Sequence, residues 1–297
     1  MMRKTLITGA TGGLGSSVVK FLKQKTKTDA IAVLVRDKNS VSAKKYADDD
    51  IEIKVGDYND LDSLVNAFKG IEVLYFVSSS DINHRIPQHK NVIDAAKKAG
   101  IKHILYTSTI RKDEQETAPL HLVVNAHKET EDFIIKSGIP YTILRHNLYA
   151  EVIAMFIGDK NQLLKTKTIY LPTGNGLTAF VPREDFAEAE AIILLNLNNY
   201  TNKILEFNGS EKVSFSEIAE ILSKISKEPI QYISPIDAEF RVKMKEIGLP
   251  TYIIDMLSMF SLGIANGEFD QETTDLETVL GRKTQSLVNF LNEIYKS

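Results

Sequence analysis

The sequence predicts an α/β fold in which a Rossmann-type, doubly wound parallel sheet is followed by a smaller, mostly helical C-terminal region. Over the first 150 residues, six short apolar runs alternate with segments of helical spacing, which is the pattern of a parallel sheet with helices on both faces. Glycines at positions 9, 12 and 15 join the first expected strand to the first expected helix. After about residue 150 the alternation ends, and most later segments have helical spacing.

The first strand and its turn predict a phosphate-binding site. Residues 5–8 are expected to form a buried strand, and residues 16–25 place apolar side chains at helical spacing. Gly9 allows a tight turn, Gly12 lets a pyrophosphate approach the backbone, and Gly15 lets the helix pack on the strand. An ordinary glycine-rich turn is the alternative, but the position of the run directly between strand and helix favours a dinucleotide. The expected contacts are Gly9, Thr11, Gly12, Gly13, Leu14 and Gly15.

The second strand, at residues 31–35, ends in Arg36 and Asp37. In a βαβ unit, the residue about 20 positions past the glycines meets the adenine ribose. An arginine there pairs with a 2′-phosphate, whereas an acid holds the ribose hydroxyls. Arg36 therefore favours NADP(H), while Asp37 keeps NAD(H) as a second option. A solvated charge cluster at a strand end is the alternative.

Polar residues follow the next three strands, which are expected at residues 51–55, 73–77 and 104–107. Ligands of doubly wound sheets bind at the carboxyl ends of the strands, so these residues are candidate cofactor contacts. Asp57 and Tyr58 are placed to flank an adenine, although a plain turn would have the same spacing. The other candidates are Ser78, Ser79, Ser80, Thr107 and Ser108.

The remaining segments complete the expected architecture. Helices are expected near residues 61–68, 88–99, 120–136, 182–197, 236–248, 251–264 and 287–295, and strands at 141–144, 204–207 and 230–233. Ser214 and Glu217 have the spacing of a capping box, which opens a further helix. We expect residues 1–150 to form an NAD(P)-binding domain and residues 151–297 a closely packed substrate-binding or lid region, part of which returns to the sheet.

Composition excludes several classes of function. The 297-residue chain has a formal net charge of −3, which gives no basic field for nucleic acid. It contains no cysteine, which excludes disulfides and a thiolate nucleophile. No apolar run approaches the roughly 20 residues of a membrane span, and the stretch after Arg3 and Lys4 is too short for a signal peptide. We expect a cytoplasmic protein, with a homodimer as one option. No metal is expected, because metal-ligand spacing to carboxylates is lacking at His84, His89, His103 and His121.

Several runs along the whole chain carry a family resemblance. They are GATGGLG at 9–15, VRD at 35–37, GD at 56–57, QHKNVIDAAKKAG at 88–100, YTS at 106–108, AHKETE at 126–131, GIPYTILR at 138–145 and VPREDFAEA at 181–189. With these runs the chain resembles the atypical short-chain dehydrogenases/reductases, and within them the NmrA-like group that includes type 2 quinone oxidoreductases and triphenylmethane reductases. The resemblance implies an NADPH-dependent oxidoreductase that transfers hydride to a quinone or a similar planar electrophile.

One departure from the superfamily bears on the chemistry. Most of its dehydrogenases use a tyrosine with a lysine four residues later, and no tyrosine here has lysine at that spacing. Counting back from the turn at residues 138–140, His127 takes the place of the tyrosine and Glu131 that of the lysine. Alcohol–ketone chemistry is therefore not expected. A quinone mainly needs proximity to the nicotinamide, and His127 is a candidate to assist by donating a proton. The alternative for His127 is a polar residue on a half-exposed helix face.

Candidate substrate contacts follow the last strand of the sheet. Asn147 and Tyr149 are expected to line the pocket, and Tyr149, Phe156 and Phe180 could form an aromatic floor for a planar acceptor. Core packing is the alternative for these aromatic residues. The expected substrate-binding set is His127, Asn147, Tyr149, Phe156 and Phe180. Ser108 has the place of the superfamily's substrate-orienting serine, between Thr107 and Thr109.

Two other functions compete with a reductase. The first is a non-catalytic NAD(P)-binding redox sensor of the NmrA type, which would have a protein partner. The loss of the tyrosine–lysine pair fits this function equally well. The second, an epimerase or dehydratase acting on a nucleotide sugar, needs the missing tyrosine and ranks last.

Overall fold

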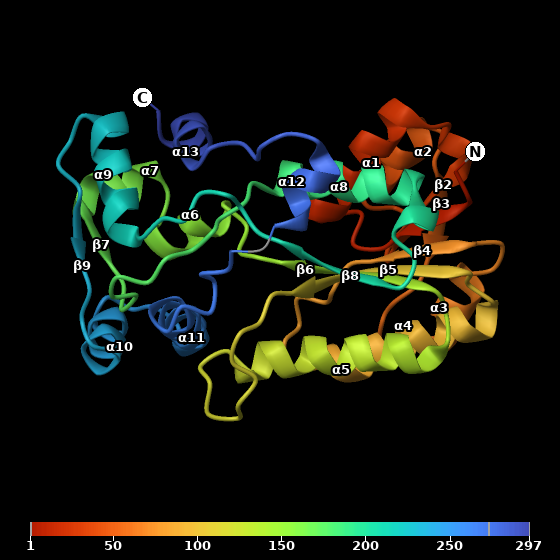
Figure 1. Cartoon of the computed structure of the whole chain (residues 1–297), viewed down its shortest axis with the longest axis horizontal. Helices are drawn as coiled ribbons and strands as arrows, with labels where there is room; N and C mark the ends of the chain where they lie inside the picture. Colours follow the sequence, from red (N-terminus) through yellow and green to blue (C-terminus); the bar gives the residue numbers. More distant parts are fainter. Residues whose placement is uncertain (1, 273, 297) are drawn as a thin grey trace. The chain divides into compact units, whose positions relative to one another are not determined.

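The computed structural model describes residues 2–272 and 274–296, and these divide into two compact units (Figure 1). Unit 1 contains residues 2–109, 123–146 and 183–206. Unit 2 contains residues 110–122, 147–182 and the described residues from 207 onward. The domain boundary near residue 150 stays a prediction.

Unit 1 is built on a seven-stranded sheet with the order β3-β2-β1-β4-β5-β6-β8. The strands are β1 (Thr5–Ile7), β2 (Ile31–Val35), β3 (Glu52–Val55), β4 (Val73–Phe76), β5 (His103–Thr109), β6 (Tyr141–His146) and β8 (Lys203–Phe207). The ladders that join β1 to β6 are parallel. The chain builds outward from β1 to β3 and then returns to add β4 on the other side of β1. This reversal confirms the doubly wound Rossmann-type fold and creates a switch point between β1 and β4.

Helices cover both faces of this sheet (Figure 1). Helices α3 (Leu61–Ala67), α4 (Arg85–Ala99) and α5 (His121–Ser137) lie on one face, and α1 (Gly13–Lys25), α2 (Val41–Asp48) and α8 (Arg183–Leu195) lie on the other. Every residue of β2 and β4 is buried, as expected of parallel strands covered on both sides. Helix α2 was not predicted from the sequence, because only Ala43 of that helix is buried and no apolar stripe marks it.

Unit 2 is mostly helical, as predicted. Its helices are α6 (Val152–Ile157), α7 (Lys160–Thr166), α9 (Phe215–Ser226), α10 (Asp237–Glu246), α11 (Thr251–Ala265), α12 (Asp275–Leu280) and α13 (Leu287–Tyr295). Strands β7 (Thr168–Tyr170) and β9 (Gln231–Ile233) pair in parallel. The capping box is confirmed, because Ser214 and Glu217 satisfy each other's backbone N–H groups at the start of α9. Helices α6, α7 and α12, which span only two turns or less, and strand β7 were not predicted from the sequence.

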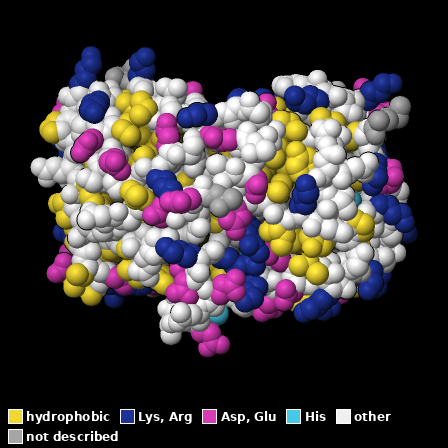
Figure 2. Space-filling model, viewed as in Figure 1, with side chains coloured by type: hydrophobic (Ala, Val, Ile, Leu, Met, Phe, Trp, Pro, Cys, Tyr) yellow, Lys and Arg dark blue, Asp and Glu magenta, His cyan; other side chains and the backbone are white. Residues whose placement is uncertain are grey.

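The charges on the surface and the length of the helices indicate which kinds of partner the protein can contact. Figure 2 shows basic and acidic side chains interspersed over the visible face of unit 1. None of the helices in the described part of the chain has the length and apolar character needed to cross a bilayer.

Candidate functional site

A cleft of about 330 Å³ opens in unit 1 at the carboxyl ends of β1 to β4, where the strand order reverses. Its lining includes many residues that the sequence predicts as cofactor contacts: Gly9, Thr11, Arg36, Asp57, Tyr58, Ser78, Ser79 and Ser80. Asn59, Asp81 and Gln88 also line the cleft and were not predicted from the sequence. Ligands of doubly wound sheets bind at this point, so the cleft is the candidate cofactor site.

The glycine turn at one end of the cleft needs its glycines. Gly9 has a φ of +60°, a conformation that side chains disfavour, and its carbonyl accepts the N–H of Gly12 at 2.9 Å. A Cβ on Gly15 would lie 2.5 Å from the Gly9 carbonyl oxygen, so no side chain fits there. Within the described residues no side chain caps the start of α1 at Gly12 and Gly13, so its first N–H groups suit a phosphate. Leu14 has its side chain buried in unit 1.

The two residues after β2 have different roles. The side chain of Asp37 bonds to the backbone two residues on, where its Oδ1 accepts the N–H of Asn39 at 2.8 Å. Arg36 is exposed at the cleft, and in the described part of the chain no acidic side chain pairs with it. The guanidinium therefore suits a 2′-phosphate, while the acid that kept NAD(H) as an option is engaged in a turn.

Tyr58 is fixed inside the wall that follows β3. Its hydroxyl lies 2.9 Å from the Val77 carbonyl and 2.6 Å from Thr8 Oγ1, and Thr8 Oγ1 in turn accepts the N–H of Val77 at 2.9 Å. Burial raises the pKa of Tyr58, so the phenol stays neutral. The residue lines the cleft while its hydroxyl joins the ends of three strands, and the predicted contact of its ring with adenine stays a prediction.

The hydroxyls of Thr107 and Ser108 are engaged within the protein. Thr107 Oγ1 accepts the N–H of Ser78 at 2.9 Å, so it supports the wall that follows β4. Ser108 Oγ donates to Glu131 Oε1 at 2.6 Å. Both side chains are buried, and their predicted contact with the cofactor is not tested by this geometry.

His127 is a buried residue of α5 and does not lie on a half-exposed face. Its side chain is 5% exposed, and Nδ1 lies 2.8 Å from the hydroxyl of Tyr106. Burial raises the pKa of Tyr106, which keeps that phenol protonated. The hydrogen bond orients the imidazole, and the assisting role of His127 stays a prediction.

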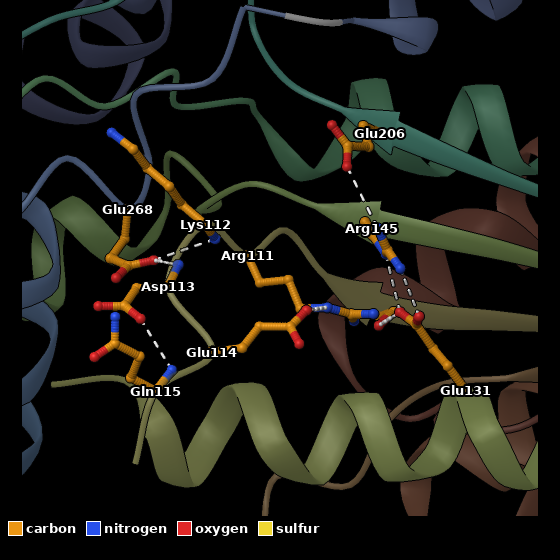
Figure 3. Close-up of polar contacts among 10 residues, drawn as sticks. Arg111, Lys112, Asp113, Glu114, Gln115, Glu131, Arg145, Glu206 and Glu268 are labelled. Carbon is orange, nitrogen blue, oxygen red and sulfur yellow. Dashed lines mark hydrogen bonds and ion pairs between the residues drawn. The ribbon is translucent and has the colours of Figure 1, made fainter. Parts of the chain in front are cut away.

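Glu131 occupies the place of the superfamily's lysine with the opposite charge. Glu131 as a whole is 2% exposed, and its carboxylate receives two hydrogen bonds from Arg145, from Nε at 3.1 Å and from Nη2 at 2.8 Å (Figure 3). Arg145 also lies 3.5 Å from Glu206. A neutralised carboxylate cannot lower the pKa of a nearby phenol as a lysine does, so this part of the site is not built for alcohol–ketone chemistry.

The remaining predicted substrate contacts lie in unit 2, in different surroundings. Asn147 is buried, with its amide donating to Asn208 at 2.8 Å and to the Phe269 carbonyl at 3.0 Å. Phe180 is buried against Phe215, with ring centroids 6.1 Å apart. These contacts account for both residues as parts of the interior of unit 2, which matches the core-packing alternative for Phe180. Their contact with a substrate stays a prediction.

Phe156 differs from these, because it lines an apolar pocket of about 130 Å³. The pocket is formed by Leu148, Val152, Met155, Phe156, Met256, Leu257 and Phe260 from α6, the segment before it, and α11. The rings of Phe156 and Phe260 meet edge to face, with centroids 6.5 Å apart. Tyr149 is half-buried and pairs with Val181 through an isolated bridge. The residues of α11 were missed, because nothing in their local pattern separates a pocket wall from a core.

The fold and the cleft define a family. The chain belongs to the NmrA-like family, whose model matches residues 1–294. Quinone oxidoreductase 2 of Escherichia coli is 33% identical over 289 residues, which cover 97% of this chain and 98% of that protein.

Solved structures agree with this assignment. The structure of the Escherichia coli NADPH-dependent quinone oxidoreductase complexed with NADPH is 32% identical, has a TM-score of 0.89 and covers 98% of this chain and 100% of that one. The triphenylmethane reductase of Citrobacter sp. is 29% identical with a TM-score of 0.89, covering 99% of this chain and 100% of that one. The negative transcriptional regulator NmrA, at 14% identity and a TM-score of 0.77, shares the fold.

Proposed function

We propose that this chain is an NADPH-dependent oxidoreductase that transfers hydride to a quinone or a similar planar electrophile. The observation that carries the proposal is the cleft at the switch point, which is lined by Gly9 and Thr11 of the glycine turn and by the exposed Arg36. This cleft occurs in a chain that is similar over nearly its whole length to an NADPH-dependent quinone oxidoreductase.

The residues of the cleft fit NADPH. The turn at Gly9 and Gly12 and the start of α1 would hold the pyrophosphate, and Arg36 would pair with the 2′-phosphate. The nicotinamide supplies the hydride when the cofactor is bound, and the protein supplies binding and orientation.

Reduction of a quinone by hydride consumes one further proton. The hydride brings two electrons and one hydrogen, so the quinone becomes a hydroquinone monoanion that is protonated by water or by a side chain. His127 is the side chain that we assign to this assistance, with its ring oriented by Tyr106. A cationic dye that accepts hydride at carbon needs no proton.

We further propose that the apolar pocket of unit 2 contacts the acceptor. Its lining by two phenylalanines, two methionines and aliphatic side chains suits an aryl or alkyl group, with Phe156 as a stacking surface. The acceptor is thus a small molecule with an apolar aryl or alkyl part. We place its reduction in the cytoplasm, a location that a sequence without cysteine fits.

The redox sensor remains the second candidate. It is supported by the fold shared with the transcriptional regulator, a likeness at 14% identity. Turnover separates the two functions, because a sensor binds the dinucleotide without consuming it.

The test is to mix purified protein with NADPH and a simple benzoquinone and to follow the nicotinamide absorbance, with NADH in parallel. The rate without protein is subtracted. Protein-dependent oxidation that prefers NADPH supports the reductase. Tight binding of NADPH without oxidation by any quinone or triphenylmethane dye would establish the sensor, and no binding would contradict both functions.

A further inference from the structure

One turn of α4 holds every polar group of Ser79, a residue that lines the cleft. Arg85, Gln88 and His89 have the spacing that places side chains on the same face of a helix. Arg85 Nε donates to the Ser79 carbonyl at 2.8 Å, and His89 Nε2 accepts the Ser79 N–H at 2.9 Å. Gln88 Oε1 accepts the hydroxyl of Ser79. The wall that follows β4 is therefore fixed by α4.

The same helix also holds the wall that follows β3. Gln88 Nε2 donates to Asn59 Oδ1 at 3.2 Å, and Asn91 Nδ2 donates to the Tyr58 carbonyl at 2.9 Å. Tyr58 and Asn59 line the same cleft as Ser79. Helix α4 thus ties together two neighbouring walls of the cleft.

His89 can make its bond to Ser79 only as a neutral ring with one tautomer. The hydroxyl of Thr130 donates to the Ala126 carbonyl at 2.7 Å, so it must accept from His89 Nδ1, which lies 2.8 Å away. Nδ1 therefore carries the hydrogen, and Nε2 presents a lone pair to the Ser79 N–H. Burial, together with the charge of Arg85, lowers the pKa of His89 to about 3, which keeps the ring neutral at physiological pH.

Burying the charged side chain of Arg85 at this position costs free energy. Its side chain is 7% exposed, and within the described residues Nη1 is buried without a hydrogen-bond partner. Burial lowers the pKa of this guanidinium, because the charged form is desolvated. An unfavourable buried charge indicates a function beyond stability. The function that the geometry offers is the bond to the Ser79 carbonyl.

From these contacts we infer that Arg85 and His89 are positioning residues, which with Gln88 hold the two walls of the cleft in the conformation that the dinucleotide needs. This inference rests on the proposed function. Neither Arg85 nor His89 lines the cleft, so both act through Ser79. Because the walls are already ordered, less conformational entropy is lost when the cofactor binds. Affinity therefore increases without a new contact.

The test measures the dissociation constant of NADP⁺ by isothermal titration calorimetry, which needs no turnover. His89→Leu removes the acceptor of the Ser79 N–H, and we expect the dissociation constant to rise about tenfold, the effect of losing one buried hydrogen bond. The dissociation constants of NADP⁺ and NAD⁺ should rise by the same factor, because the walls do not contact the 2′-phosphate. The KM for the quinone should not change. His89→Gln, whose amide oxygen can accept the same N–H, should restore most of the affinity.

Two further variants keep the test decisive. Arg85→Met removes the donor to the Ser79 carbonyl together with a buried charge, so it is expected to fold even if His89→Leu does not. This variant should raise the dissociation constant of NADP⁺ about threefold to tenfold. Lys90→Ala, which loses an exposed ion pair with Asp94 on the same helix, is the control and should bind as the wild type does.

The outcomes separate the inference from the proposed function. Folded Arg85 and His89 variants with wild-type affinity for NADP⁺ overturn the inference, and so does an equal loss of affinity in Lys90→Ala. A wild-type protein that does not bind NADP⁺ overturns the proposed function itself.

Discussion

The cleft of unit 1 and the apolar pocket of unit 2 are built in opposite ways. The cleft is made of backbone turns and polar side chains at the ends of parallel strands, and hydrogen bonds fix its walls. The pocket is made of apolar side chains, mainly from α6 and α11. Directional bonds select one ligand, whereas apolar contact tolerates many. We therefore expect strict recognition of the cofactor and broad recognition of the acceptor.

The largest effect should come from the glycine turn of the cleft. In Gly12→Val the new Cβ would lie 3.3 Å from the Gly9 carbonyl oxygen, a tight contact that the turn must relieve by a small shift, and the side chain would stand where the phosphate is expected. NADPH affinity should fall on the order of 100-fold, measured by calorimetry. Gly12→Ala is the graded control and should lose less. Unaltered affinity in the valine variant would refute the role of this turn.

The second effect should come from Arg36, and it should depend on the cofactor. Arg36→Ala should reduce the affinity for NADPH by about 10-fold to 100-fold, the range of a charge-assisted contact with phosphate. The affinity for NADH should change by less than about twofold. Lys38→Ala is the matched control, because it removes an exposed cation two residues away. Equal losses for NADPH and NADH would mean that Arg36 does not read the 2′-phosphate.

The third effect belongs to the pocket and should leave the cofactor untouched. Phe156→Ala should raise the KM for a benzoquinone about tenfold, from the loss of buried aromatic surface, while the dissociation constant of NADPH stays the same. Phe156→Leu should retain much of the wild-type KM. Val242→Ala, at an exposed position of α10, serves as the control. If the phenylalanine variant changes cofactor affinity instead, the division of roles between cleft and pocket is wrong.

The smallest effect should come from His127, and it should depend on the acceptor. His127→Ala should reduce kcat for a quinone by less than about tenfold, because water can supply the proton. The same variant should reduce a triphenylmethane dye at the wild-type rate, since transfer to carbon needs no proton. Measuring both acceptors with one preparation provides the control. Complete loss with both, in a folded variant, would assign His127 an essential role.

The difference between the regions also explains what the sequence could predict. The glycine turn, the alternation of strands and helices, and the position of Arg36 depend on residues that are close in the sequence, and their patterns have local physical causes. The bonds from Ser108 to Glu131 and from Tyr58 to Val77 join residues of different elements that no periodic pattern connects, and so do the bonds from Ser79 to α4. Spacing therefore predicted that Tyr58 and Ser79 are at the carboxyl ends of the strands, and it could not predict which of their atoms are already engaged.

The pocket shows the same limit more strongly. Phe156 and Phe180 look alike in sequence, yet Phe156 lines the pocket and Phe180 packs in the interior. Helix α11 contributes pocket residues about 100 positions after Phe156, and no local pattern links the two. Helix α2 was missed for another reason, since a helix without an apolar stripe has no periodic signal.

The most direct test of the central claim, hydride transfer from NADPH to a planar acceptor, follows the hydrogen itself. NADPH carrying deuterium at the reactive carbon of the nicotinamide, one stereoisomer at a time, is mixed with the protein and a triphenylmethane dye. The reduced dye is then analysed by mass spectrometry. We predict that one stereoisomer gives a product with one deuterium at the central carbon, in proportion to the NADPH consumed. Reduced dye that carries only hydrogen from solvent with both stereoisomers, or bound NADPH that is never oxidised, would contradict the account.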